Sequence, residues 1–365
     1  MLWILITGAK TDTGRVHPDI SRRMENIGFV AGQSLLGYCV YSTSGSEFAG
    51  SVTNDYRYTC CVAMSTPLAC MATSALYASA VGVKPYGAIA SFTGGVDGVL
   101  WGLLTTNALK SQNVDLSPTM SAAIPLFASL GLNAGWMVYS QNYGASEGSY
   151  LTKTLFSFQS VYYYYQVKRV FLGDYVRFDT SGELITSDFE KDAVILPAVS
   201  VAGGMGGFLL THRWSDYTAG DALFMSANIS KGSLIMSNLI RTGYLQTFWS
   251  GEKWNSLEEQ TKYYVILVSG YYPGSPTMNR VGGVAQIVGG LAGAGISYML
   301  IKDKHLSLFE GLVYSLVPTF AYWAAWAPMV FFVDGDPRPY GSFMPLVQVA
   351  LDVGTSYLIY RMLVR

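Results

Sequence analysis

Charged residues are scarce in this chain. Only 13% of its 365 residues are charged, and half of them are apolar, whereas an ordinary soluble domain is about 25% charged. A soluble protein of this length would need more charge to coat its surface. The formal net charge is −1, so nothing indicates a nucleic acid or another polyanion as a partner. The lack of charge therefore predicts a protein of the lipid bilayer.

Catalytic and metal-binding signatures are also missing. The sequence has no phosphate-binding GxxxxGK[ST] loop and no HExxH. The glycine run from Gly203 to Gly207 is not a dinucleotide fingerprint, since no strand precedes it. The few cysteines and histidines show no metal-ligand spacing: they are Cys39, Cys60, Cys61, Cys70, His17, His212 and His305. We therefore expect no enzyme activity, no metal and no cofactor, and we interpret the cysteines as small buried apolar residues.

Long apolar segments dominate what is present. Most contain about 20 residues, which is the length that a helix needs to cross a hydrocarbon core of about 30 Å. They cover residues 24–42, 62–82, 86–108, 120–140, 147–167, 193–212, 219–240, 282–301, 308–333 and 342–364. This pattern predicts an all-α transmembrane fold of about ten helices. The alternative is a transmembrane β-barrel, but barrel strands are about 10 residues long and alternate in polarity, which these segments do not.

Glycines recur within these segments at the four-residue spacing of the GxxxG motif. Two residues four apart lie on the same face of a helix, and two glycines there let a neighbouring backbone approach closely. The spaced sets are Gly28/Gly32, Gly94/Gly98/Gly102, Gly131/Gly135, Gly203/Gly207 and Gly289/Gly293. We expect all of them to be helix-packing sites.

An internal repeat of helical hairpins is predicted as well. Four stretches share a plan in which an apolar segment, a short polar turn and a second apolar segment follow one another: 67–104, 125–158, 197–235 and 284–320. Two of the turns contain capping boxes, in which a hydroxyl and a carboxylate satisfy free backbone N–H groups. These caps are Thr218 with Asp221 and Ser307 with Glu310.

Longer polar stretches separate some of the hairpins and set the domain organisation. Residues 168–192 are expected to form an extramembrane insertion with a small β-hairpin around Thr180–Gly182, and residues 241–281 a second insertion. The predicted parts are a polar segment at 1–23, helices with two hairpins at 24–167, the third hairpin at 193–240, and the fourth hairpin with a terminal helix at 282–365. The tight turns would then face one side of the membrane and the insertions the other.

The charged residues inside the apolar segments include Asp97, Lys153, Lys231 and Asp352. A charge in the bilayer is costly unless it is paired, lines a polar path or reaches water. Asp97 and Lys231 occupy nearly equivalent places in two hairpins, so we expect them to form an intramembrane charge pair. Two other interpretations stay open, namely that tilted helices carry these charges to water, or that they line a transport path.

The function expected from these features is that of a structural or scaffold subunit in a larger membrane assembly, with the lipid bilayer and other membrane subunits as partners. The alternative is a repeat-built transporter or channel for a small solute. The chain would be an integral, multi-pass protein, and the sequence does not indicate which membrane holds it.

Overall fold

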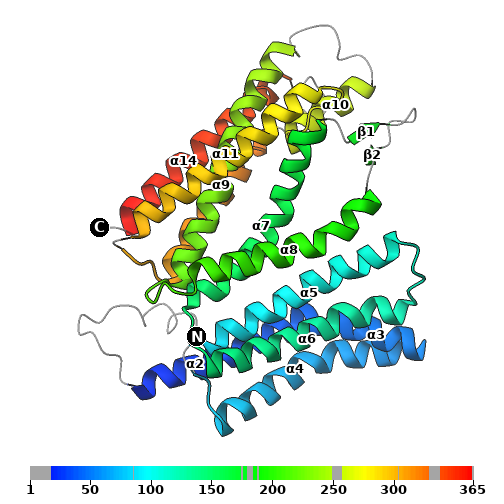
Figure 1. The fold of residues 1–365 in the computed structure, drawn as a ribbon, viewed down its shortest axis with the longest axis vertical. Helices are drawn as coiled ribbons and strands as arrows, with labels where there is room; N and C mark the ends of the chain where they lie inside the picture. The colour runs from blue at the N-terminus through cyan, green and yellow to red at the C-terminus, as the bar shows by residue number, and fades with distance from the viewer. Residues whose placement is uncertain are drawn as a thin grey trace. The chain divides into compact units, whose positions relative to one another are not determined.

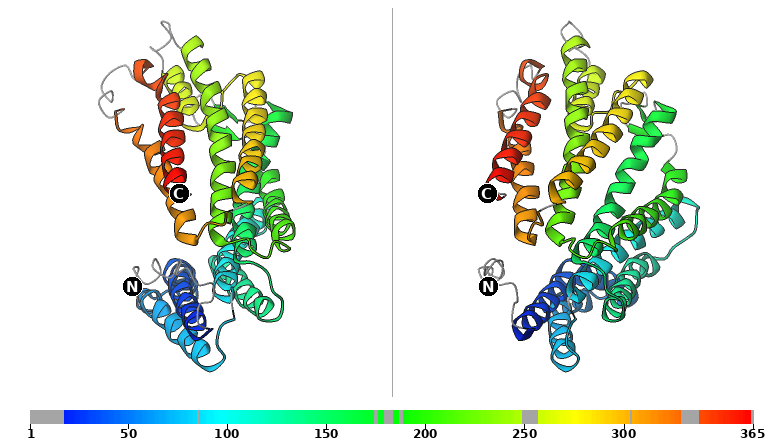
Figure 2. Two further views of the ribbon diagram at one scale, coloured as in Figure 1. Left: turned by 90° about the vertical axis from the view of Figure 1, so that its left-hand side faces the viewer. Right: turned by 60° about the vertical axis from the view of Figure 1, so that its left-hand side comes forward.

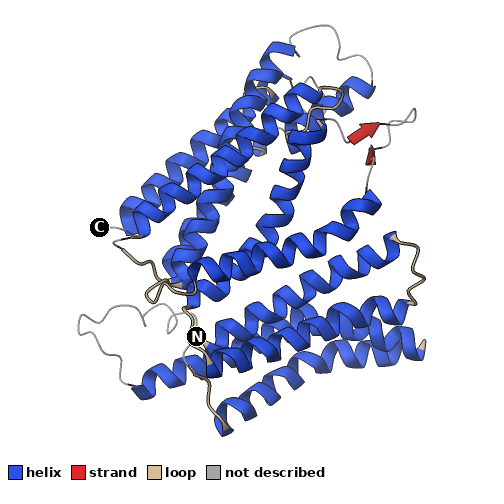
Figure 3. Ribbon diagram, viewed as in Figure 1, coloured by secondary structure: helices blue, strands red, loops and turns tan. Residues whose placement is uncertain are grey.

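The computed structural model describes residues 18–84, 86–173, 176–178, 184–186, 189–248, 257–302, 304–328 and 338–363. Helices make up almost all of these residues, and the exceptions are short loops and two three-residue strands (Figure 3). The prediction of a helical fold is confirmed, and the β-barrel alternative is disfavoured.

The chain divides into two compact units. Unit 1 comprises Met1–Val161 with Phe189–Ala219, and unit 2 comprises Tyr162–Asp188 with Gly220–Arg365. Helix α7 (Glu147–Leu172) contributes its first half to unit 1 and its second half to unit 2. Each unit is described by itself below.

Unit 1 begins with a continuous helical run made of α2 (Pro18–Leu36), the π-helical turn η1 (Gly37–Tyr41) and α3 (Ser42–Thr53). This run is longer than the predicted segment 24–42. The π-turn lies where the chain meets the next helix, since a Cβ added at Gly37 would be 2.9 Å from the Cβ of Cys70. The run ends at Asn54, which has a φ of 53°; asparagine tolerates this left-handed conformation better than most residues.

Three further helices of unit 1 follow, namely α4 (Tyr56–Ala80), α5 (Gly87–Ser111) and α6 (Pro118–Asn142). Of these, α4 and α6 pack beside α3, and α5 packs beside α2 and α6 (Figure 1). Helix α8 (Phe189–Thr211) packs beside α5. The Asp55 side chain accepts a hydrogen bond from the backbone N–H of Arg57, and Ser117 does the same for Met120. These N-caps satisfy donors that an α-helix leaves unpaired at its start.

Unit 2 consists of α9 (Ala219–Phe248), α10 (Leu257–Ser269), α11 (Pro276–Ile301), α12 (Leu308–Ala324), α13 (Arg338–Gly341) and α14 (Met344–Leu363). Helices α12 and α14 pack together, as Figure 2 shows. The sequence placed α10 in a polar insertion, but one side of this short helix is apolar. Its residues Tyr263, Ile266 and Leu267 are buried in a core with Leu245 and Met344.

The first insertion is shorter than predicted, because α7 continues to Leu172 and α8 already begins at Phe189. Between them, β1 (Val176–Phe178) and β2 (Leu184–Thr186) pair antiparallel, with Arg177 opposite Ile185. The predicted hairpin is thus present, while its turn at Thr180–Gly182 lies outside the described residues.

The glycines of α5 make a close contact with α6. A Cβ added at Gly94 would lie 2.5 Å from the carbonyl oxygen of Leu132, and one at Gly98 would collide with the backbone of Ala128. Gly102 is equally close to the next turn of α6. A side chain at any of the three would push the two helices apart.

Two other glycine pairs make similar contacts. Gly203 and Gly207 of α8 lie against Ser160 and Phe156 of α7. In unit 2, Gly289 of α11 meets the backbone of Gly232 in α9, and Gly293 meets the same helix one turn away. In each of the three helix pairs, the glycines join the second helix of one predicted hairpin to the first helix of the next. Glycine packing therefore lies between the predicted hairpins rather than within them.

The remaining glycine pairs differ from this pattern. Gly28 and Gly32 of α2 are in ordinary van der Waals contact with Ala88 and Phe92, at 3.7 and 3.5 Å for an added Cβ. Nothing among the described residues would come within 4 Å of a Cβ at Gly131 or Gly135. The expectation that this pair packs against another helix of the chain is therefore wrong for the described structure, because both glycines lie on an exposed face of α6.

Acidic residues connect helix starts to neighbouring tight turns. Ser307 and Glu310 form the predicted capping box at the start of α12, with each side chain accepting from the other's backbone N–H. Thr218 directly precedes α9, as predicted. The Asp221 carboxylate, however, accepts from the Leu306 N–H and lies 2.8 Å from His305 Nδ1. Asp221 thus holds the turn before α12. A capping pattern within one helix does not predict this contact, because its partners lie far along the chain.

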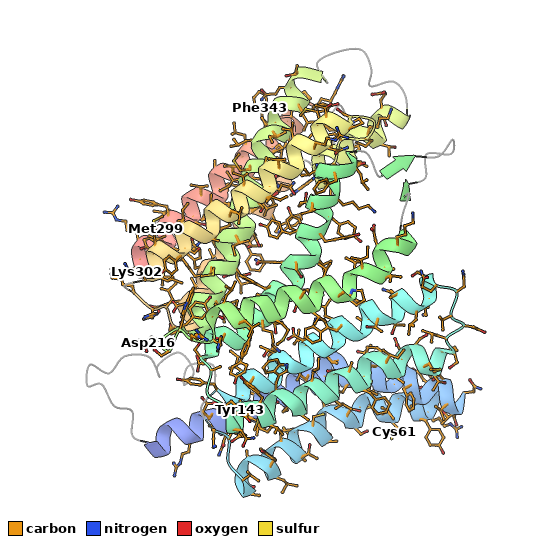
Figure 4. All side chains as sticks on the ribbon, in the orientation of Figure 1. Cys61, Tyr143, Asp216, Met299, Lys302 and Phe343 are labelled. Carbon is orange, nitrogen blue, oxygen red and sulfur yellow. The ribbon has the colours of Figure 1, made fainter. Side chains whose placement is uncertain are left out.

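Five described helical segments are long and apolar enough to cross a membrane: Tyr56–Ala80, Gly87–Ser111, Pro118–Asn142, Lys191–Thr211 and Pro276–Ile301. These segments support the assignment to a membrane. The cysteines are not the buried residues that we expected: Cys39 and Cys61 are exposed, and Cys60 and Cys70 are half-buried. Figure 4 shows Cys61 at α4 and Met299 on the outer side of α11, so both helices present side chains outward.

Candidate functional site

The four charged residues singled out above form two ion pairs. Lys153 Nζ lies 2.5 Å from Asp97 Oδ2 in unit 1, and Lys231 Nζ lies 4.0 Å from Asp352 Oδ1 in unit 2. The expected pair of Asp97 with Lys231 is therefore replaced by two others. Equivalent positions in two predicted hairpins do not imply contact, because these two residues belong to different units with separate cores.

The Asp97–Lys153 pair is sealed inside unit 1. Asp97 of α5 and Lys153 of α7 are both 0% exposed. The Lys153 ammonium lies 4.1 Å from the centre of the Trp136 ring, a favourable cation–π distance. Tyr150 and Phe208 surround that ring at centroid distances of 5.8 and 5.2 Å. No solvent or ligand reaches this pair, so its geometry favours a structural role.

Gly204 of α8 lies close to the backbone of α7 at Lys153, one member of the sealed pair. A Cβ added at Gly204 would lie 2.9 Å from the backbone oxygen of Lys153. Neither side chain of the pair is exposed to solvent. Each charge therefore depends on the other, since a buried charge without its partner is strongly unfavourable.

The Lys231–Asp352 pair has a different setting. Lys231 of α9 donates hydrogen bonds to the backbone oxygen of Tyr314 at 3.1 Å and to Ser356 Oγ at 2.8 Å. Its ammonium lies 3.9 Å from the centre of the Tyr314 ring. The Tyr314 hydroxyl in turn donates to Asn228 Oδ1 at 2.8 Å. The ammonium thus has contacts on several sides, but it is too far from the Asp352 carboxylate for a direct hydrogen bond.

This second pair lines a cavity of about 410 Å³ between α9, α11, α12 and α14, which we call the unit 2 groove. Its volume is in the range of ordinary ligand pockets. Most of its wall is apolar, and Val288 and Ile296 of α11 and Tyr357 of α14 are at least half-exposed at its rim. The groove combines apolar walls with one pair of opposite charges.

A polar network in unit 1 lies next to the π-turn. The Asn133 side chain donates from Nδ2 to Gln33 Oε1 and to the Tyr41 hydroxyl, both at 2.8 Å, and the Ser91 hydroxyl donates to Asn133 Oδ1. Ser129 donates to the Gly95 backbone oxygen at 2.7 Å. Asn133 therefore bonds across helices, to partners on α2, η1 and α5.

Two buried arginines of unit 2 were missed by sequence reasoning, which placed them in or beside polar insertions. Arg169 donates to the backbone oxygen of Gly270 at 2.8 Å, and Arg241 donates to that of Leu267 at 2.7 Å. Both oxygens lie at the C-terminal end of α10, where unpaired carbonyl groups attract cations. The arginines thus dock α10. No sequence signal pointed to this role, because arginines in a polar stretch usually face water.

Comparisons with known proteins do not extend this picture. No family model, curated protein or solved structure matches the chain. Within the described ranges, no three His, Cys, Asp or Glu side chains gather in a way that could hold a metal ion. The site is therefore interpreted from its own geometry.

Proposed function

We propose that this chain is an integral, multi-pass membrane protein that acts as a structural subunit of a larger membrane assembly. The proposal includes about ten membrane-spanning helices, of which five are supported by length and apolar composition. The others, α2, α7, α9, α12 and α14, match the remaining predicted segments. In this arrangement the helices repeat as hairpins that pack through glycines, and the tight turns share one side of the membrane.

The observation that carries the proposal is the exposed glycine pair of α6. The other four GxxxG sets each contact a neighbouring helix, whereas Gly131 and Gly135 have no neighbour among the described residues. Phe127 and Val138 flank this face and are 61% and 60% exposed. The same motif that packs helices inside the chain is thus repeated on its surface, where a helix of another subunit is the fitting partner.

Helix α4 supports the same conclusion. Only Ser74 and Ala78 are buried along its 25 residues, and apolar side chains such as Met64 and Leu68 are exposed. A helix that is apolar all round belongs in lipid or against other membrane helices. The sealed Asp97–Lys153 pair also supports a structural role. It stabilises the packing of unit 1 and does not line a path for a solute.

The experiment is purification of the full chain in mild detergent, followed by native mass spectrometry. We expect other membrane proteins to co-purify at fixed stoichiometry. Gly131→Leu and Gly135→Leu should reduce their amount at least tenfold, because the added side chains occupy the exposed face. Gly295→Leu is the matched control, since Gly295 is also open but has no glycine four residues away. A lone, monodisperse wild-type protein would contradict the proposal.

A second candidate function is transport of a small solute, and the unit 2 groove favours it. A charge pair that lines a cavity within apolar helices is a feature of transport pathways. Flux measurements in proteoliposomes distinguish the two functions: a solute gradient that dissipates with wild type and persists with Lys231→Met would support transport.

A further inference from the structure

We propose that the unit 2 groove binds a neutral amphiphile, whose polar head is a hydroxyl group held between Lys231 and Asp352 and whose apolar tail lies along α11. This site goes beyond the structural role proposed above and does not depend on it.

The charge balance of the groove selects the head group. Lys231 and Asp352 are the sole charged residues among those that line the described cavity, and together they sum to zero. An anionic or cationic head would leave one net charge in an apolar setting, which is costly. A hydroxyl group avoids this cost because it accepts a hydrogen bond from the ammonium and donates one to the carboxylate.

The spacing of the pair leaves room for such a group. The distance of 4.0 Å between Lys231 Nζ and Asp352 Oδ1 exceeds the roughly 2.7–2.9 Å of a direct charge-assisted hydrogen bond. A hydroxyl oxygen placed about 2.8 Å from both atoms is compatible with that separation. Two of the three ammonium donors serve Tyr314 and Ser356, so one remains for a ligand. In unit 1, by contrast, the 2.5 Å pair is closed.

The walls of the groove select the tail. Val288, Ala292, Ile296 and Leu300 of α11 line it at four-residue intervals, so they form one apolar stripe. Twelve residues of helix extend about 18 Å, which suits a long alkyl chain. Gly289 and Gly293 bring α11 against the α9 backbone, and this close approach places the stripe beside Lys231. The exposed rim at Val288 and Tyr357 opens toward the surroundings, from which a lipid-soluble ligand would enter.

The test is competition in purified full-length protein with a photoreactive analogue of hexadecanol as the probe. The competitors are hexadecanol, palmitate and hexadecylamine, which share a chain and differ in head-group charge. For wild type we expect hexadecanol to compete at least tenfold better than either charged compound. Mass spectrometry should place the label on α11 or α14.

Charge variants then test the role of each partner. Asp352→Asn leaves the groove positive and should shift the preference at least tenfold toward palmitate. Lys231→Met leaves it negative and should shift the preference toward hexadecylamine. Lys110→Met, an exposed lysine at the end of α5, is the control and should behave as wild type.

Two results would overturn the proposal. One is label that maps outside the groove or that none of the three compounds displaces from wild type. The other is a head-group order that stays the same in both charge variants, because the groove would then hold the chain alone. If either variant does not fold, the wild-type competition and the position of the label still test the proposal. The co-purification experiment tests the glycine pair of α6, which is not part of the groove. Either proposal can therefore be contradicted without affecting the other.

Discussion

Lys153 Nζ lies 2.5 Å from Asp97 Oδ2, and both side chains are fully buried in unit 1. The aromatic ring of Trp136 covers the ammonium. The corresponding pair in unit 2 is longer and lines a cavity. The two pairs therefore have different consequences when they are disrupted.

Removing one partner of the sealed pair should destabilise the protein strongly. We expect Asp97→Leu or Lys153→Met alone to lower the free energy of unfolding by about 3–5 kcal/mol, since each leaves a buried charge unpaired. The double variant should recover most of the loss. Unfolding in mixed detergent micelles measures this, with Glu259→Gln as control, because the Glu259–Lys262 pair is partly exposed and worth less than about 1 kcal/mol. A double variant as unstable as the singles would contradict the paired role.

Glycines at covered and open positions should respond differently to the same substitution. Gly98→Leu places a side chain into the α6 backbone, and we expect it to prevent folding or to destabilise the protein by more than the roughly 1–3 kcal/mol typical of overpacking. Gly131→Leu on the open face should leave thermal stability in detergent unchanged within a few degrees. Equal effects of the two substitutions would show that the α5–α6 contact is not as close as described.

The Asn133 network should contribute measurably to unit 1. Asn133→Ala removes hydrogen bonds to Gln33, Tyr41 and Ser91, and interhelical bonds in membranes contribute about 0.6 kcal/mol each on average. We expect a loss of about 1–3 kcal/mol in the free energy of unfolding. Asn142→Ala is the matched control on the same helix, because Asn142 is exposed and bonds within α6. A loss as large for the control would rule out a specific role for the network.

The Asp221 carboxylate should be needed to hold the turn before α12. Asp221→Ala removes its contacts with the Leu306 N–H and with His305, and leaving a buried donor unsatisfied costs about 1–3 kcal/mol. We expect faster amide hydrogen exchange at Leu306 and its neighbours. Asp115→Ala, at an exposed loop position, should leave exchange unchanged. Unaltered exchange in Asp221→Ala would contradict the assigned contact.

The sequence sufficed for features that local chemistry sets. Apolar runs of about 20 residues predict helices because a helix satisfies its own backbone hydrogen bonds wherever it is placed. Ser307 and Glu310 are three residues apart in one turn, so their capping box needs no distant partner. The short strands of the predicted β-hairpin likewise lie close together in the chain. Helix α10 was not predicted, because its stability comes from burial of Tyr263 and Leu267 against distant residues.

By itself, the amino-acid sequence determined where most of the long helices lie and that Asp97, Lys153, Lys231 and Asp352 fall within apolar segments. Only the tertiary structure decided that Asp97 pairs with Lys153 and Lys231 with Asp352. It also decided that the first pair is sealed and the second lines a groove. Likewise, it decided that Gly98 is covered while Gly131 is open. The physical reason is the separation along the chain of the residues that interact. Helix formation depends on neighbours a few residues away. Ion pairing and glycine contacts depend on which helix faces come together, and many faces of this chain are similarly apolar.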